Sequence, residues 1–134
     1  MYKGNLQEEG KDKIARFLAT LRDETGKLLP GIKELSYPDG GNYIGEVAQE
    51  SIREGRGLYR YINGDVYFGG WRQEKFHGQG RYMFSSGETY QGELSHGLKE
   101  GVGTYYYNNG TYYSGNWHDD LKEGYGIYEV PEKQ

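Results

Sequence analysis

The chain has 134 residues, enough for one ordinary domain but too few for a large enzyme beside a recognition module. It contains 23 glycines and 15 tyrosines but only 34% hydrophobic residues, so a thick aliphatic core does not organise the fold. The absence of cysteine excludes disulfides, thiolate zinc sites and a thiol nucleophile, and a formal charge of −4 argues against broad binding of nucleic acid.

The first ten residues are polar and mixed in charge, unlike a secretory signal. No apolar run in the sequence approaches the roughly 20 residues of a membrane span. We therefore expect a soluble, intracellular and cytoplasmic protein.

The segment from about residue 7 to 30 predicts a short amphipathic helix. Its apolar residues fall at i, i+3, i+4 and i+7 on one helix face: Ile14, Phe17, Leu18 and Leu21. Thr25-Gly26 marks a helix end, and Pro30-Gly31 a break before a strand. We favour packing of this stripe on the chain's own sheet. Two alternatives stay open: a helix presented to a partner, and a helix that covers an aromatic face until a partner displaces it.

The rest of the sequence repeats with a period of 23 residues, apart from an offset of 24 after the first unit. Each unit begins with a glycine, a tyrosine, a second glycine and an apolar residue at fixed spacing, such as Gly64, Tyr67, Gly69 and Trp71. The equivalent tyrosines are Tyr43, Tyr90 and Tyr113, and the equivalents of Trp71 are Val47, Leu94 and Trp117. A G-x-G pair then precedes two further positions, which are occupied by Tyr59 and Tyr61, Tyr82 and Phe84, Tyr105 and Tyr107, and Tyr128 and Val130.

Within each element the marked residues are two apart, which is the strand period, so the aromatic residues and the glycines share one face of a sheet. The glycines leave room for neighbouring rings to lie over bare backbone. We expect the other face to be solvated, with Leu58, Ile62 and Tyr106 as exceptions. Asn63-Gly64 and its equivalents predict tight turns in which both central residues have positive φ, and these alternate with loops of about six residues.

These features predict an all-β protein, an elongated single-layer antiparallel sheet of tandem β-hairpins with a short inserted amphipathic helix near the N-terminus. The pattern G-x-x-Y-x-G-x-W followed by G-x-G-x-Y-x-F resembles the MORN (membrane occupation and recognition nexus) repeat from roughly Ser36 to Val130. The match departs from the motif at Val47 and Leu94, where Trp is favoured, and at Val130, where an aromatic residue is favoured. All three residues are apolar, so the register holds.

We expect one continuous domain with four repeats in residues 38–130, at about 40–62, 64–85, 87–108 and 110–130. Residues 1–37 fit a degenerate first hairpin that is opened by the helical insertion. Its first strand matches Tyr2, Gly4 and Leu6, and its second matches Gly31, Leu35 and Tyr37. Residues 131–134 form a tail.

No residue pattern indicates catalysis or cofactor binding. The histidines His77, His96 and His118 occupy different repeat positions and lack the spacing of metal ligands. The glycine pairs open strands rather than helices, so they form no phosphate cradle. The glutamates before these pairs, Glu54, Glu100 and Glu123, are expected to be solvated. We expect no enzyme activity, no metal, no cofactor, no small-molecule substrate and no nucleic acid partner.

The aromatic face has the clearest potential for binding. Its rings pack in part against one another, yet a single-layer sheet has no second layer to cover such a face. We predict partner contacts from twelve residues: Tyr43, Tyr59, Tyr61, Tyr67, Trp71, Tyr82, Phe84, Tyr90, Tyr105, Tyr107, Tyr113 and Trp117.

The resemblance implies a non-enzymatic scaffold or assembly subunit of a cytoskeletal, ciliary, flagellar or membrane-associated complex. A helix or extended segment of a protein partner would lie on the aromatic face. The alternative is a peripheral membrane module that binds acidic phospholipid headgroups through Lys11, Lys13, Arg16 and Arg22. The net negative charge disfavours it. Homodimerisation through unpaired sheet edges is also left open.

Overall fold

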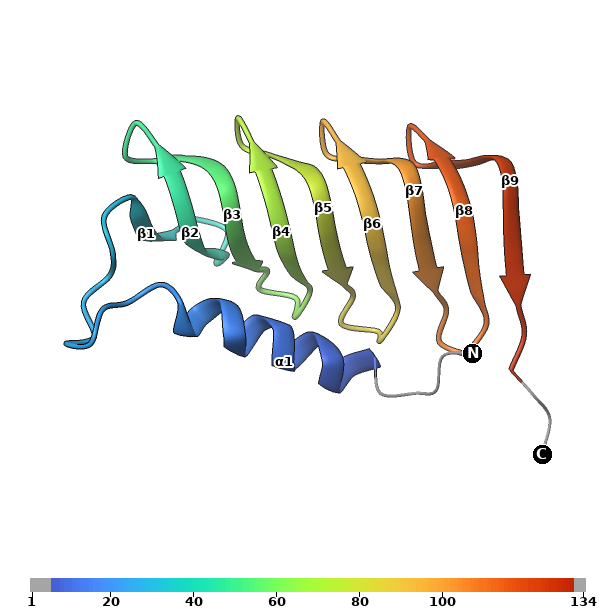
Figure 1. Ribbon diagram of the computed structural model, residues 1–134, viewed down its shortest axis with the longest axis horizontal. Helices are drawn as coiled ribbons and strands as arrows, with labels where there is room; N and C mark the ends of the chain where they lie inside the picture. The colour runs from blue at the N-terminus through green and yellow to red at the C-terminus, as the bar shows by residue number, and fades with distance from the viewer. Residues whose placement is uncertain (1–5, 132–134) are drawn as a thin grey trace.

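The computed structural model describes residues 6–131 (Figure 1). Nine strands form one antiparallel sheet in which each strand pairs with its neighbours in the chain. The strands are β1 Ile32–Ser36, β2 Asn42–Ala48, β3 Ile52–Arg60, β4 Val66–Arg72, β5 Lys75–Met83, β6 Thr89–Ser95, β7 Leu98–Tyr106, β8 Tyr112–His118 and β9 Leu121–Glu129. The helix α1, Leu6–Ala19, precedes them. The predicted all-β sheet of tandem hairpins with a short N-terminal helix is confirmed.

The hairpins at Asn63-Gly64 and its equivalents differ from the prediction. Tyr61 N donates to Asp65 O at 2.9 Å, and Gly64 N donates to Tyr61 O at 3.0 Å, which leaves three residues in the loop. Gly64 has a φ of 97°, whereas Asn63 is not among the residues with positive φ. The connection is therefore a turn closed by a left-handed glycine, not a two-residue turn. Asn63 contributes its side chain instead, because its Oδ1 accepts a hydrogen bond from Asp65 N at 2.9 Å.

The connections predicted as six-residue loops are mostly two-residue turns. Between β4 and β5, Gln73 and Glu74 both have positive φ, 47° and 72°. The preceding unit holds this turn in place: Glu74 N donates to Arg53 O at 3.1 Å, and Gln73 N donates to Glu54 Oε1 at 3.0 Å. These bonds offset the strain of left-handed residues that are not glycine. Glu54 is therefore not simply solvated, as expected from the sequence, but joins one repeat to the next.

α1 lies along one face of the sheet (Figure 1), and the aromatic residues of the repeats lie on the opposite face. The helix buries Ile14, Phe17 and Leu21 against sheet residues Leu58, Phe68 and Met83. Phe17 and Phe68 are in direct contact, with ring centroids 4.9 Å apart. The favoured packing of the helix on the chain's own sheet is what the structure shows, but not on the aromatic face. Leu58 was expected as an apolar exception on this second face, but the expectation that the face is otherwise solvated was wrong over β4 and β5, because Phe68 and Met83 extend Leu58 into an apolar patch.

Polar contacts also fix the helix on the sheet. Arg81 of β5 is only 3% exposed, and its Nη2 donates to Glu9 Oε1 at 2.7 Å. Gln7 Nε2 donates to Gly87 O at 2.9 Å, which holds the start of the helix near the β5–β6 hairpin. Leu6, matched to the strand of a degenerate hairpin, is the first residue of the helix, while Tyr2 and Gly4 lie outside the described residues. The predicted second strand of that hairpin corresponds to β1, which pairs with β2.

Candidate binding face

One tyrosine in each unit is a central, buried element of the aromatic face. Tyr67 is 0% exposed, and its hydroxyl donates to Gly70 O at 2.8 Å. Its ring lies over Gly80, where an added Cβ would come within 2.2 Å of the tyrosine Oη. The same arrangement recurs at Tyr43 over Gly57, Tyr90 over Gly103 and Tyr113 over Gly126. The predicted packing of rings over bare glycine backbone is therefore present in all four units.

The two tryptophans fill the space between successive tyrosines. Trp71 meets Tyr43 and Tyr67 edge-on, with ring centroids 5.3 and 5.2 Å apart. Its indole N–H donates to Gly57 O at 3.1 Å, which satisfies its polar atom inside an apolar contact. Trp117 repeats this geometry with Tyr90 and Tyr113, and its N–H donates to Gly103 O at 3.0 Å.

The structure divides the twelve predicted contact residues into two sets. Seven are buried and make up the interior of the face: Tyr43, Tyr59, Tyr67, Trp71, Tyr90, Tyr113 and Trp117. Five are half-buried and present ring surface to solvent: Tyr61, Tyr82, Phe84, Tyr105 and Tyr107. The second set, which we call the exposed row, is the part that a binding partner could contact directly.

Hydrogen bonds between units hold two rings of the exposed row. The Tyr82 hydroxyl donates to Asp65 Oδ2, and the Tyr105 hydroxyl donates to Glu88 Oε1, each at 2.7 Å. Burial and these carboxylates raise the pKa of both tyrosines, so both rings stay neutral. Burial alone would raise the pKa of Asp65, but hydrogen bonds from Ser85, Tyr82 and Asn63 outweigh it and lower that pKa. The rings are thus fixed in orientation before any partner binds.

Three cations at equivalent repeat positions lie over the aromatic face, a feature that the sequence interpretation missed. The Arg53 guanidinium is 4.8 Å from the Trp71 ring centroid, and Lys99 Nζ is 5.2 Å from that of Trp117. Lys122 Nζ is 4.9 Å from the ring of Tyr113. These distances are within cation–π range. The 23-residue spacing of Lys99 and Lys122 was the available signal, since it places them beside the repeated rings.

The third unit lacks a tryptophan, and the face is hollow there. Leu94 occupies the position of Trp71 and Trp117. A cavity of about 170 Å³ lies beside it, lined by residues that include Phe84, Tyr90, Leu94 and Lys99. Phe76 stands where the other units carry Arg53 and Lys99, and its ring stacks on Tyr67 at 3.9 Å. Leu94 and Phe76 together therefore leave a hollow between the sites that Trp71 and Trp117 fill.

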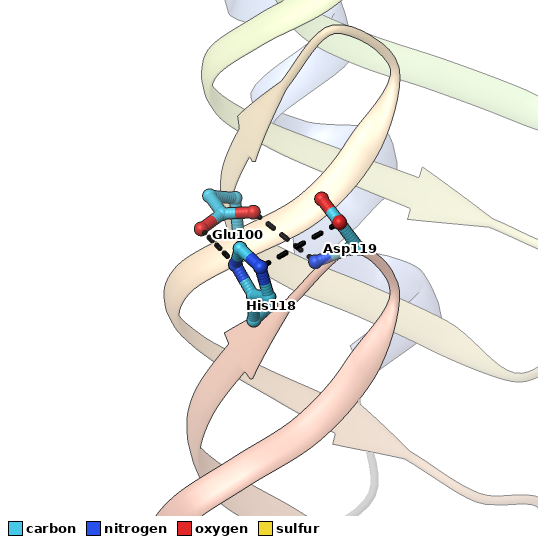
Figure 2. A group of neighbouring side chains, drawn as sticks. All are labelled: Glu100, His118 and Asp119. Atoms are coloured by element: carbon cyan, nitrogen blue, oxygen red, sulfur yellow. Dashed lines mark hydrogen bonds and ion pairs between the residues drawn. The ribbon is translucent and has the colours of Figure 1, made fainter.

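One group brings a histidine together with two carboxylates, contrary to expectation from sequence spacing (Figure 2). His118 Nδ1 lies 2.9 Å from Glu100 Oε2, and His118 Nε2 lies 3.5 Å from Asp119 Oδ2. Glu100 also accepts a hydrogen bond from Asp119 N at 3.1 Å, as Glu54 does from Gln73 N. His118 and Asp119 are exposed. The repetition of the glutamate contact at Glu54 identifies Glu100 as a cap for the β8–β9 turn.

The sequence of the chain also matches a known family of repeats, in agreement with the repeated geometry of the aromatic face. The MORN repeat family matches residues 43–66, 67–89, 90–112 and 113–130. The chain belongs to the MORN repeat family. We number its repeats first to fourth in this order. Among curated proteins, none matches the chain significantly.

Membership of this family indicates a general class of function. MORN repeats are non-enzymatic in general and occur in proteins that interact with other proteins or with membrane lipids. Within residues 6–131, α1 is too short and too polar to span a bilayer.

Proposed function

We propose that this MORN protein is a non-enzymatic scaffold or assembly subunit whose aromatic face binds a helix or extended segment of a protein partner. The exposed row carries the proposal. It runs along a face that α1 leaves uncovered, and two of its rings, Tyr82 and Tyr105, are already held in place by hydrogen bonds to carboxylates. Ordered aromatic residues provide large contact area with little loss of conformational entropy.

The hollow beside Leu94 supplies the anchor point for such a partner. A cavity of about 170 Å³ with walls from Phe84 and Tyr90 suits one apolar side chain. Lys99 and Asp120 stand at the same cavity, and their side chains are paired at 3.4 Å. The partner segment would place an apolar residue in the hollow and polar groups beside this ion pair.

A filling variant tests the anchor without removing the buried core. Phe76→Lys/Leu94→Trp rebuilds at the third repeat the pair formed by Lys99 and Trp117, in which the indole N–H has a backbone carbonyl to bond. We expect the variant to keep its fold, as judged by circular dichroism and thermal unfolding, and to lose at least about tenfold in partner affinity. Leu94→Met, which leaves the hollow largely open, is the matched control.

Site-specific crosslinking identifies the partner and the face together. A photoreactive phenylalanine analogue at position 84 would lie in the exposed row, whereas the same analogue at position 102 would lie on the opposite face, where Val102 is 59% exposed. In extracts of the native cells, we expect a protein adduct from position 84 that disappears in the Phe76→Lys/Leu94→Trp background. Adducts that arise only at position 102, or that survive the filling variant, would refute binding of the partner at the hollow beside Leu94.

The resemblance supports a cytoskeletal, ciliary, flagellar or membrane-associated assembly as the setting, and imaging of the tagged chain would distinguish these locations. The lipid alternative makes a separate prediction. Flotation with phosphatidylserine vesicles that is lost in Lys11→Gln/Arg16→Gln, without any protein adduct at position 84, would favour the membrane module. Arg22 is a weaker candidate for that role because it is paired with Glu34 at 3.4 Å.

A further inference from the structure

The helix-covered face contains a cavity at the second repeat that is lined by cations. Its volume is about 500 Å³, and its walls include Lys13 of α1, Arg56 of β3 and Arg81 of β5. His77 also lines it, and no aspartate or glutamate does so among the described residues. Such a site is notable in a chain with 20 acidic and 16 basic residues. Its electrostatic potential favours an anion.

The first and third repeats show which anion binds the backbone amide at the position equivalent to this cavity. In the first repeat, Glu46 Oε1 accepts a hydrogen bond from Arg56 N at 2.7 Å. In the third repeat, Glu93 Oε1 accepts one from Val102 N at 3.1 Å. Each amide belongs to the middle residue of a G-x-G pair. The first and third repeats thus have a built-in carboxylate ligand for this amide, whereas the fourth has Asn116 at that position.

The second repeat has the amide without the carboxylate. Gly70 occupies the position of Glu46 and Glu93, and Gln79 occupies that of Arg56 and Val102. Around Gly55 and Gly101 an added Cβ would meet a glutamate oxygen at 1.9 and 1.8 Å. At the equivalent Gly78 nothing within the described chain lies within 4 Å of that point. The space that a carboxylate fills in the first and third repeats is therefore open, and it faces the cationic cavity.

Arg81 forms part of the wall of the same cavity. Its side chain is 3% exposed, and its Nη2 is bonded to Glu9 and Gln91. Its Nε and Nη1 have no acceptor among the described residues. These two atoms are fully buried, with Nη1 close to Gly10 of α1, so Arg81 shapes the cavity wall rather than contacting a ligand directly. Lys13 and Arg56 form no ion pair within the described residues, although Arg56 stacks on Phe17 and Phe68.

We propose that this cavity binds a carboxylate from outside the chain, which takes the place of the glutamate that Gly70 removes. One oxygen accepts from Gln79 N, as Glu46 does from Arg56 N, and the cations Lys13 and Arg56 neutralise its charge. The carboxylate comes from a glutamate side chain of a bound peptide or from a free dicarboxylate. This site lies on the opposite face from the exposed row, so it does not depend on the binding of a partner to that row.

Amide NMR on the full chain tests this site. Uniformly labelled protein is titrated with glutarate, with acetyl-Gly-Glu-Gly-amide, and with the matched acetyl-Gly-Gln-Gly-amide. We expect a saturable downfield shift of the Gln79 amide with the first two probes and none with the third. The Val102 amide, already bonded to Glu93, is the internal control and should not move. A tighter response to the peptide assigns the site to a protein side chain, and an equal or tighter response to glutarate assigns it to a free carboxylate.

Variants decide whether the cavity is responsible. Arg56→Gln and Lys13→Gln should each weaken the response by about tenfold, because each removes one charge-assisted contact. Lys11→Gln on the same helix is the control for net charge and should leave it unchanged. Gly70→Glu should abolish it by restoring the internal ligand, although His77 O must move from the added Cβ, which it would approach at 2.1 Å. The proposal fails if Gln79 shows no saturable shift or if Arg56→Gln leaves the shift intact.

Discussion

The second and third repeats differ at two adjacent positions that have opposite consequences for the two faces of the sheet. The second carries Gly70-Trp71, and the third carries Glu93-Leu94. Trp71 fills the aromatic face, while Gly70 leaves the other face open at Gln79. Leu94 leaves a hollow in the aromatic face, while Glu93 closes the other face by bonding Val102 N. In each of these two repeats, therefore, one face of the sheet is filled and the other has an opening.

The repeated residues hold the sheet together, whereas the departures from the repeat leave the two openings that we propose as binding sites. The buried tyrosines and their glycines are the same in all four repeats. They contact glycines and rings of their own repeat and of the adjacent repeat, as expected for a repeat protein. A partner can distinguish one position along the sheet from the next where adjacent repeats differ, as they do at Gly70-Trp71 and Glu93-Leu94.

Removal of Trp71 should have the largest effect on stability. Trp71→Ala deletes edge-on contacts with Tyr43 and Tyr67 and the bond to Gly57 O, so we expect a loss of about 4 kcal/mol. Leu94→Ala, at the equivalent position beside an existing hollow, should lose about 2 kcal/mol. Urea unfolding of both variants measures the difference. Equal losses would mean that Trp71 and Leu94 do not differ as core residues.

The glycines beneath the tyrosines should come next. In Gly80→Ala the new methyl group meets Tyr67 Oη at 2.2 Å, and Tyr67 has no room to move because it is 0% exposed. We expect a loss of about 3 kcal/mol from overpacking. Gly78→Ala, two residues earlier, meets open space and should lose only about 1 kcal/mol from its φ of 79°. Thermal unfolding of the pair separates steric from conformational effects, and a larger loss at Gly78 would contradict this account.

Helix docking at the second repeat depends on an ion pair that the third repeat lacks, since Thr104 stands in place of Arg81. Glu9→Gln leaves the 3% exposed guanidinium of Arg81 without its carboxylate, and we expect a loss of about 2 kcal/mol, moderated by the exposure of Glu9. Glu9→Gln/Arg81→Met should recover most of this, because no unpaired charge remains buried. The measurement is the rate of proteolysis within α1 together with urea unfolding. A double variant no more stable than Glu9→Gln would show that the unpaired charge is not the cause.

Much of the fold follows from the sequence because the repeat fixes the strand period. Tyr67 and Trp71 are four residues apart in an element that also carries two glycines, which predicts a strand with one aromatic face. Turn geometry was harder to predict, since the left-handed pair Gln73-Glu74 is held by Arg53 O and Glu54, residues of another unit. No local pattern carries that information.

The face of the sheet that the helix covers also could not be predicted from the sequence. The stripe of Ile14, Phe17 and Leu21 predicts an apolar face but not which side of a sheet it covers. That choice depends on Leu58 and Phe68, which stand opposite each other on β3 and β4 and are separated by ten positions in the chain. The division of the predicted contact residues into buried and half-buried sets likewise depends on packing across strands.

The smallest expected effect concerns the turn between β8 and β9, which Glu100 caps by accepting a hydrogen bond from Asp119 N. The equivalent residue in the second repeat is His77, which has no carboxylate for such a cap. The hydrogen bond that His118 donates to Glu100, with the charges of Asp119 and Glu100, raises the pKa of His118 above its ordinary 6.5. The hydrogen bonds from His118 and Asp119 N lower the pKa of Glu100 below 4.5. The histidine's contribution to stability is therefore full below pH 6.5 and is lost as the pH rises through the raised pKa. The glutamate's contribution is full above pH 4.5 and is lost on acidification.

The pair should thus be strongest between about pH 4.5 and 6.5. We expect the NMR titration midpoint of His118 to lie above 6.5 in the native chain and to fall in Glu100→Gln. His77→Gln is the matched control, because His77 has no such carboxylate cap and its loss should leave the titration of His118 unchanged. An unchanged His118 midpoint in Glu100→Gln would instead assign the shift to Asp119. Because both side chains are largely solvated, the effect on unfolding should be small and should shrink with added salt.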